Sequence, residues 1–302
     1  MIYLLWAILL SGMVSMVFKF IEKKDCEGDY VTWVNYLFAA SFSLVRAFQG
    51  GLAQQWGKMA QCTPSTLLTQ KTVPNTLLLL TVLGAVSGIC YLASLLLIRV
   101  SIAKNGLSIT TIFGKFSFAF TAVFTLLLWR EFPQGLGAVG FAIAVVGLLL
   151  MSGRRGAKEI QSVGVLFGLA LINSTIEMFS KLFVQYGIER YKDLMVFTIF
   201  GSAAVYCTVY VALQLKKKTI RRGIRLRDIL AGVAVGLPNV LTTTVQMRAL
   251  ERLPAAVVFS SISVGVLFLT VLVGRFVFKE KITRRQALCS LLAFAGVVLI
   301  NL

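Results

Sequence analysis

The sequence predicts an all-α integral membrane protein with ten transmembrane helices in two inverted five-helix repeats. Hydrophobic residues make up 58% of the 302 residues and charged residues only 14%, and the mean hydropathy is +0.85. The apolar runs reach the roughly 20 residues that a helix needs to cross a bilayer. Because a segment in lipid must satisfy its backbone hydrogen bonds internally, such runs are expected to be helical.

The second prediction, internal duplication, comes from matching residues in the two halves. When the chain is shifted by 149 positions, from 99 to 248, Arg99 falls on Arg248, Glu131 on Glu280 and Gly147 on Gly296. The same shift places Thr121, Ala144 and Leu150 on Thr270, Ala293 and Leu299. The beginnings of the halves match at a shift of 162, from Lys19 to Lys181, because the first half has a longer polar loop. Internal duplication in an apolar chain is typical of secondary transporters.

Each repeat is expected to contain five helices, the first repeat over residues 1–153 and the second over 161–302. The N-terminus is apolar from Ile2 and lacks a basic leading region, so we expect a first transmembrane helix there and not a signal peptide. The predicted helices are Ile2–Ile21, Val31–Gln49, Asn75–Val100, Gly106–Trp129, Gln134–Met151, Ser162–Tyr186, Leu194–Leu215, Asp228–Leu250, Ala255–Phe278 and Arg284–Leu302. An odd number of helices per repeat makes the second copy enter the membrane from the opposite side.

The net charge of +18 is attributed to membrane topology and anionic lipid headgroups, because the bases lie mostly at helix ends and in loops. No nucleic-acid-binding module is visible, so nucleic acid is not an expected partner. The expected partners are the lipid bilayer and a small-molecule substrate, and both a monomer and a homodimer stay open. The loops with more bases, including the cluster from Lys216 to Arg227, are expected to face the cytoplasm.

The sequence contains no pattern that indicates a metal or cofactor site. The chain has no histidine, which removes the common zinc sites and every histidine-based catalytic triad. Its five cysteines are scattered without a CxxC pair. We therefore expect no metal, no cofactor and no enzymatic activity.

Lys115 is the most informative residue inside a predicted span. A base at the centre of a membrane helix costs roughly 2.5–3.5 kcal/mol on insertion scales, so it usually has a function. Thr111 lies one turn earlier on the same helix face. Lys115 is a candidate ligand for an anionic substrate group, and the alternative is a buried lysine neutralised by Glu177 or by deprotonation.

Glu177 is the acid farthest inside a predicted span. Asn173, Glu177 and Lys181 share one helix face, and Ser11, Ser15 and Lys19 form the matching stripe in the first helix. Asn173, Lys181 and Lys19 are candidate substrate-binding residues, and Glu177 is a candidate for proton coupling. The alternatives are an intrahelical Glu177–Lys181 pair and lysines that extend to the membrane interface.

The third and eighth predicted helices carry further polar stripes. Asn239, Thr243 and Gln246 share a face beside Pro238, and Tyr91 lies with Ser87 and Ser94 in the matching helix. We consider Tyr91, Asn239, Thr243 and Gln246 as hydrogen-bonding contacts to substrate. Polar packing between helices is an equally good interpretation.

The order of these motifs resembles the drug/metabolite transporter superfamily, in particular its EamA-like branch. The resemblance rests on Phe18-Lys19 near the end of the first helix, on the glutamates Glu131 and Glu280 after the fourth helix of each repeat, and on the glycine-rich fifth helices. The chain departs from the family's usual glycine before that glutamate, since Arg130 and Lys279 stand there. The resemblance implies export or exchange of small metabolites by alternating access around a central cavity, and family members typically have cytoplasmic termini.

We therefore predict a secondary transporter of a small polar metabolite, anionic or amino-acid-like, in the inner or plasma membrane. A membrane channel and a membrane-embedded enzyme are the alternatives. A channel needs a continuous polar path or a repeated filter, and an enzyme needs convergent nucleophile, base or metal ligands. None of these is visible in the sequence.

Overall fold

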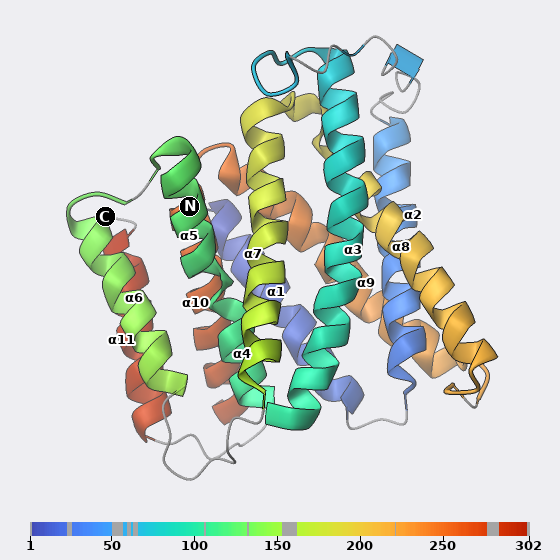
Figure 1. The fold of residues 1–302 in the computed structure, drawn as a ribbon. Helices are drawn as coiled ribbons and strands as arrows, with labels where there is room; N and C mark the ends of the chain where they lie inside the picture. Colours follow the sequence, from blue (N-terminus) through green and yellow to red (C-terminus); the bar gives the residue numbers. More distant parts are fainter. Residues whose placement is uncertain are drawn as a thin grey trace. The chain divides into compact units, whose positions relative to one another are not determined.

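The computed structural model of the chain describes residues 2–22, 26–49, 57–58, 62, 66–105, 107–131, 133–152, 162–220, 222–276 and 284–300. Over these ranges the chain is all-α, with eleven α-helices and no β-strand (Figure 1). The helices are α1 (Ile2–Glu22), α2 (Gly28–Gln49), α3 (Val73–Asn105), α4 (Leu107–Lys115), α5 (Ser117–Trp129), α6 (Leu136–Ser152), α7 (Val163–Tyr186), α8 (Lys192–Lys216), α9 (Leu226–Leu250), α10 (Ala255–Phe276) and α11 (Arg284–Ile300).

Each predicted helix has a counterpart in the structure, and one of them is divided. The predicted helix Gly106–Trp129 is two helices, α4 and α5, with Phe116 between them. The third helix, α3, extends past its predicted end at Val100 to Asn105. The eighth predicted helix, α9, continues through Pro238, and Thr242 Oγ1 donates a 2.7 Å hydrogen bond to the Pro238 carbonyl oxygen.

Several helices are long and apolar enough to cross a bilayer. In the described ranges five segments meet that criterion: Val73–Ile98, Thr110–Trp129, Val163–Tyr186, Glu189–Lys216 and Leu226–Leu250. Shorter apolar helices cover Ile2–Val14, Leu136–Gly147, Ala255–Thr270 and Leu291–Ile300. These segments indicate a multi-pass membrane protein.

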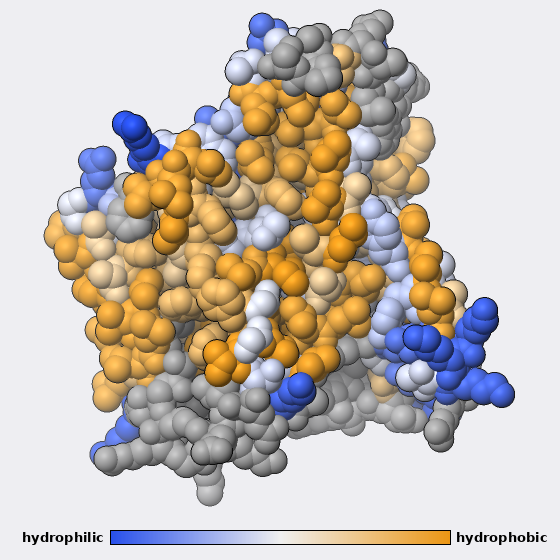
Figure 2. Space-filling model, viewed as in Figure 1, coloured by the Kyte–Doolittle hydropathy of each residue, from blue (hydrophilic) through white to orange (hydrophobic). Residues whose placement is uncertain are grey.

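These helices expose large apolar side chains on their outer surfaces, which is unfavourable in water. Leu127 is 72% exposed, Phe276 77% and Leu226 69%. Figure 2 shows hydrophobic side chains over much of the visible face of the helices, with the hydrophilic ones gathered towards the helix ends. Large contiguous apolar surfaces of this kind mark contact with lipid or protein.

The chain divides into two compact units. Unit 1 consists of Met1–Gly12, Ala93–Met178 and Ala249–Leu302, and unit 2 consists of Met13–Leu92 and Phe179–Arg248. Each unit therefore draws helices from both halves of the sequence. The predicted boundary between the repeats, at residues 153–161, lies outside the described residues.

Unit 1 contains a glycine seam in which α6 packs along α11 (Figure 1). A Cβ added at Gly140 would lie 2.5 Å from the Gly296 carbonyl oxygen. A Cβ at Gly147 would lie 2.8 Å from the Ala293 nitrogen, and one at Gly296 would lie 2.6 Å from the Ala144 nitrogen. Small residues let the two backbones meet directly, as in many membrane helix pairs.

Unit 2 is built around α2 and α8, which pack along each other in opposite directions. Trp33, near the start of α2, donates a 2.8 Å hydrogen bond to Thr208 towards the end of α8. At the other end of the pair, Arg46 forms a 3.2 Å ion pair with Asp193. These two contacts fix both the direction and the register of the helix pair.

Glycines of α3 pack against side chains of α8, and glycines of α9 pack against side chains of α2. Thr198 and Ser202 of α8 lie against Gly84 and Gly88, and their hydroxyls donate to the Leu80 and Gly84 carbonyl oxygens at 3.0 and 2.8 Å. In the same way, Gly232 and Gly236 of α9 meet α2, where the nearest side chains are Val34 and Phe38. Both contacts need glycine because a Cβ would collide with the facing helix.

One helix end carries an unusual backbone conformation. Arg130, at the C-cap of α5, has φ = 57°, and its N–H bonds to the Leu126 carbonyl oxygen at 3.0 Å. This left-handed conformation favours glycine, which has no Cβ to clash. The conformation gives a physical reason for the glycine expected from the family resemblance at this position.

We predict that Gly140→Ala lowers the stability of the purified protein by about 1–3 kcal/mol, because the added methyl group collides with backbone atoms of α11. The measurement is the apparent melting temperature in detergent. Gly164→Ala is the control, since a Cβ at Gly164 has no atom within 4 Å. An equal loss in both variants would contradict the seam.

We predict that Arg130→Gly raises the stability by about 1 kcal/mol, because it removes the strain of a side chain in the left-handed region. Arg130→Ala removes the same charge but retains a Cβ, and should bring no gain. Thermal unfolding of the two variants beside the parent chain compares these effects.

Candidate functional site

The break between α4 and α5 positions the first group of candidate residues, in unit 1. The Phe116 N–H bonds to both the Ile112 and Phe113 carbonyl oxygens, at 3.0 and 3.1 Å, so α4 ends in a tightened turn. Gly114 favours an ending here because glycine is disfavoured inside a helix. The Phe116 N–H serves the Ile112 and Phe113 carbonyl groups, and the Gly114 carbonyl group in the same last turn needs another partner.

Asn173 of α7 provides one such partner. Its Nδ2 donates to the Gly114 carbonyl oxygen at 3.0 Å, and its Oδ1 accepts a 2.7 Å hydrogen bond from Ser94 Oγ of α3. A single side-chain amide therefore connects α7 with both α3 and the end of α4. Asn173 was predicted as a substrate contact, and here it also has a structural role.

Glu177, one turn further along α7, holds the beginning of α5. Its Oε1 accepts a 2.6 Å hydrogen bond from Ser117 Oγ, and its Oε2 accepts one from Thr121 Oγ1. The Thr121 hydroxyl also lies 3.0 Å from Ser174 Oγ. Ser117, Thr121 and Ser174 are at most 1% exposed. Hydrogen bonds to an ionised carboxylate are among the strong ones, and the N-terminus of α5 adds a favourable dipole.

Lys115 is the last residue of α4, where the helix dipole favours a cation. Its side chain is partly buried, and Nζ donates a 3.5 Å hydrogen bond to Ser11 Oγ of α1. Lys115 and Glu177 are close enough to attract each other electrostatically. Thr111 lies one turn before Lys115 in α4 and is also partly buried.

A second group of candidate residues lies in unit 2. Tyr91 Oη of α3 and Thr243 Oγ1 of α9 are 3.4 Å apart, and the Thr243 hydroxyl donates to the Asn239 carbonyl oxygen at 3.2 Å. The Asn239 side chain donates to Asn35 Oδ1 of α2 at 3.2 Å. Tyr36 of α2 donates to the Tyr91 carbonyl oxygen at 3.0 Å. This group is thus a polar connection between α2, α3 and α9.

The remaining candidates are less closely connected. Gln246 lies in α9 and is partly buried, and Lys181 lies in α7 and is 5% exposed. Lys19 belongs to α1, but its side chain lies outside the described residues. The predicted site residues therefore fall into a unit 1 group (Lys115, Thr111, Asn173, Glu177) and a unit 2 group (Tyr91, Asn239, Thr243, Gln246, Lys181, Lys19).

Sequence reasoning missed the hydroxyl residues that bond Glu177, and two residues of α2. Ser117 and Thr121 are four residues apart, so they share a helix face. That spacing was the available signal, but hydroxyl residues four apart are common in membrane helices. Asn35 carried a signal, since it is an amide within the predicted span Val31–Gln49. Tyr36 had none, because its bond to the Tyr91 carbonyl oxygen joins residues distant in sequence.

Together, the apolar helices and the ionisable groups placed within them indicate a multi-pass α-helical membrane protein. Comparison with known families gives the class more closely. Residues 162–302 match the family model of the EamA-like transporter family, so this part of the chain belongs to that family, within the drug/metabolite transporter superfamily. The family suggests a membrane transporter and not an enzyme.

Comparison of the fold extends the likeness to the full length. One protein of known crystal structure aligns with a TM-score of 0.69 and 12% sequence identity, covering 99% of this chain and 96% of that one. At this identity the likeness concerns the fold alone. No curated protein sequence matches the chain.

We predict that Asn173→Leu lowers the stability by about 1–3 kcal/mol, because the Gly114 carbonyl and the Ser94 hydroxyl lose a buried partner. Thr175→Val is the control on the same helix, since the Thr175 hydroxyl bonds only within α7 among the contacts described, to the Leu171 carbonyl oxygen at 2.9 Å. Thermal unfolding in detergent measures both. Equal stability of the two variants would show that Asn173 does not hold α4.

Proposed function

We propose that the chain is a secondary active transporter that moves a small polar metabolite, anionic or amino-acid-like, by alternating access in export or exchange. We place it in the inner or plasma membrane. The observation that carries the proposal is the partly buried pair of Lys115 and Glu177 within apolar spans. Ionisable groups inside a membrane are costly and mark substrate, ion or proton pathways.

We also propose that the fold consists of two inverted five-helix repeats, over residues 1–153 and 161–302. Reciprocal contacts support this. Gly147 meets Ala293, and their repeat equivalents Gly296 and Ala144 also meet. Such exchange of equivalent contacts is what a twofold relation produces.

Helix direction supports the inversion independently. The second helices of the two halves are α2 and α8, and they pack antiparallel through Trp33–Thr208 and Arg46–Asp193. If the two copies entered the membrane from the same side, these equivalent helices would be parallel. Their opposite directions favour insertion from opposite sides, as in many secondary transporters.

Lys115 is the proposed ligand for the anionic group of the substrate. Its hydrogen bond to Ser11 is long, at 3.5 Å, so the ammonium group can take a carboxylate or phosphate oxygen without giving up a strong bond. Thr111 and Asn173 are proposed contacts beside it in unit 1. Tyr91, Asn239, Thr243, Gln246, Lys181 and Lys19, all in unit 2, are further proposed substrate-binding residues.

Glu177 is the proposed coupling residue. Both of its oxygens accept hydroxyl hydrogens from α5. A proton added to the carboxylate turns one acceptor oxygen into a donor. Protonation then weakens the attachment of α5 to α7 and removes the charge that Lys115 faces, which connects proton binding with the substrate site.

We expect Lys115→Met to fold normally and to lose binding of the substrate. The measurement is the apparent melting temperature of the purified protein against a panel of amino acids, organic acids, phosphates and amines, because a ligand that binds the folded state raises apparent stability. Stabilisation of the parent chain by anions, absent in Lys115→Met, is the expected result.

Lys104→Met is the matched control, since Lys104 is an exposed lysine near the end of α3. It should retain the response to anions. If Lys115→Met also retained that response, Lys115 would have no role in binding. Stabilisation of the parent chain by amines alone would contradict the anionic substrate class.

A further inference from the structure

The connection between α8 and α9 carries the densest group of positive charges in the described parts of the chain. We name residues 216–220 and 222–227 the basic loop. The side chains of Lys216, Lys217, Lys218, Arg225 and Arg227 are exposed, and no acidic residue occurs between 216 and 227. Figure 2 shows hydrophilic side chains gathered at the lower right, where α8 ends.

The basic loop begins with a turn that keeps a lysine in an unfavourable conformation. The Lys218 N–H bonds to the Leu215 carbonyl oxygen and the Thr219 N–H to the Gln214 carbonyl oxygen, each at 3.0 Å. This pair of bonds is the Schellman arrangement, in which the left-handed residue is usually glycine. Lys218 occupies that position with φ = 57°. A charged side chain at a position that favours glycine suggests that the charge itself has a function.

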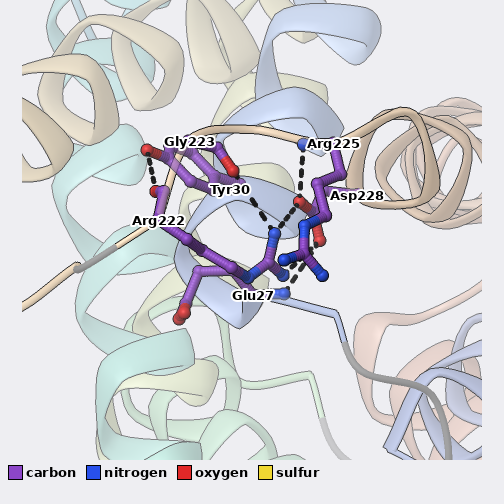
Figure 3. A network of polar contacts seen from close by, with 6 residues as sticks. All are labelled: Glu27, Tyr30, Arg222, Gly223, Arg225 and Asp228. Atoms are coloured by element: carbon purple, nitrogen blue, oxygen red, sulfur yellow. Dashed lines mark hydrogen bonds and ion pairs between the residues drawn. The ribbon is translucent and has the colours of Figure 1, made fainter.

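The end of the basic loop is fixed by a buried carboxylate (Figure 3). Asp228 is fully buried and accepts two hydrogen bonds from the Arg222 guanidinium, at 2.7 and 3.0 Å. It also accepts from the backbone N–H groups of Arg225 and Glu27, at 2.9 and 2.8 Å. Asp228 therefore joins the loop to the beginning of α2.

Two further contacts hold the middle of the loop. The Tyr30 hydroxyl donates to the Arg222 carbonyl oxygen at 3.0 Å, and the Ile220 side chain is only 5% exposed. Arg222 is engaged with Asp228, whereas the side chains of Lys216, Lys217, Lys218 and Arg227 are exposed among the described residues of the loop. Because contacts within the protein already fix the backbone of the loop, binding a partner costs little conformational entropy.

Apolar side chains stand beside these charges. Leu226 is 69% exposed, Leu230 61% and Leu215 45%. Cations next to exposed leucines match an anionic phospholipid, because the headgroup phosphate meets the bases and the acyl chains meet the leucines. A soluble anion would use the charges but leave the leucines in water.

We infer that the basic loop is a preformed binding surface for the headgroups of anionic phospholipids, with Lys216, Lys217 and Lys218 as its main phosphate contacts. The surface lies entirely within unit 2. It contains none of the residues proposed for substrate binding or coupling.

The test titrates the purified full chain in neutral detergent with phosphatidylglycerol or phosphatidylcholine and counts bound lipids by native mass spectrometry. The test variant combines Lys216→Gln, Lys217→Gln and Lys218→Gly. It should fold, because glycine relieves the left-handed strain at 218, and the melting temperature checks this. Loss of three charges should weaken phosphatidylglycerol binding about 100-fold, on the basis of the usual contribution of a base near an anionic surface.

The control variant removes three exposed lysines elsewhere, by Lys58→Gln, Lys71→Gln and Lys104→Gln. It has the same number of lost charges and should retain phosphatidylglycerol binding within a fewfold of the parent chain. Equal weakening in both variants would mean that only net charge matters and would overturn the inference. The inference would also be overturned if the parent chain bound phosphatidylcholine as tightly as phosphatidylglycerol. Complete displacement of phosphatidylglycerol by millimolar inorganic phosphate would overturn it as well.

Discussion

The hydrogen bonds of Glu177 are the constraint on which unit 1 depends. A carboxylate inside an apolar span is tolerated only if its oxygens are satisfied, and here Ser117 and Thr121 of α5 satisfy both. The arrangement needs a helix that begins at Ser117, and the break at Phe116 supplies one. The same break leaves the Gly114 carbonyl to Asn173 and puts Lys115 at a helix end. One interrupted helix thus gathers the ionisable and amide groups that we assign to transport.

The second organising constraint is close backbone contact between helices of opposite halves. Without water there is no hydrophobic force between membrane helices, so packing relies on small residues and hydrogen bonds across the contact. In unit 1 this role belongs to the glycines of α6 and α11, and in unit 2 to Gly84, Gly88, Gly232 and Gly236. Because such seams require backbone-to-backbone fit, the packing within each unit tolerates little change at these positions.

The sequence predicted the helices well because the length of an apolar run is a local signal. It failed at Phe116, since a one-residue interruption leaves the apolar pattern intact. Asn173, Glu177 and Lys115 were found because a polar group in an apolar run stands out. Their partners Ser117 and Thr121 were not, because hydroxyl residues are frequent in such helices and only the fold shows which of them face a carboxylate. The sequence also did not predict the left-handed backbone of Arg130 and Lys218, because that conformation depends on the hydrogen bonds that end the preceding helix.

The central claim is that the protein is a carrier, and counterflow in sealed proteoliposomes tests it most directly. Vesicles loaded with unlabelled substrate, chosen from the ligands that stabilise the protein, are diluted into a trace of labelled substrate. A carrier that alternates between two faces should draw the label into the vesicles transiently above its equilibrium level, chemically unchanged. Entry of the label only up to equilibrium, with no overshoot at any internal concentration, would contradict alternating access and indicate a channel. Chemical conversion of the label would indicate an enzyme.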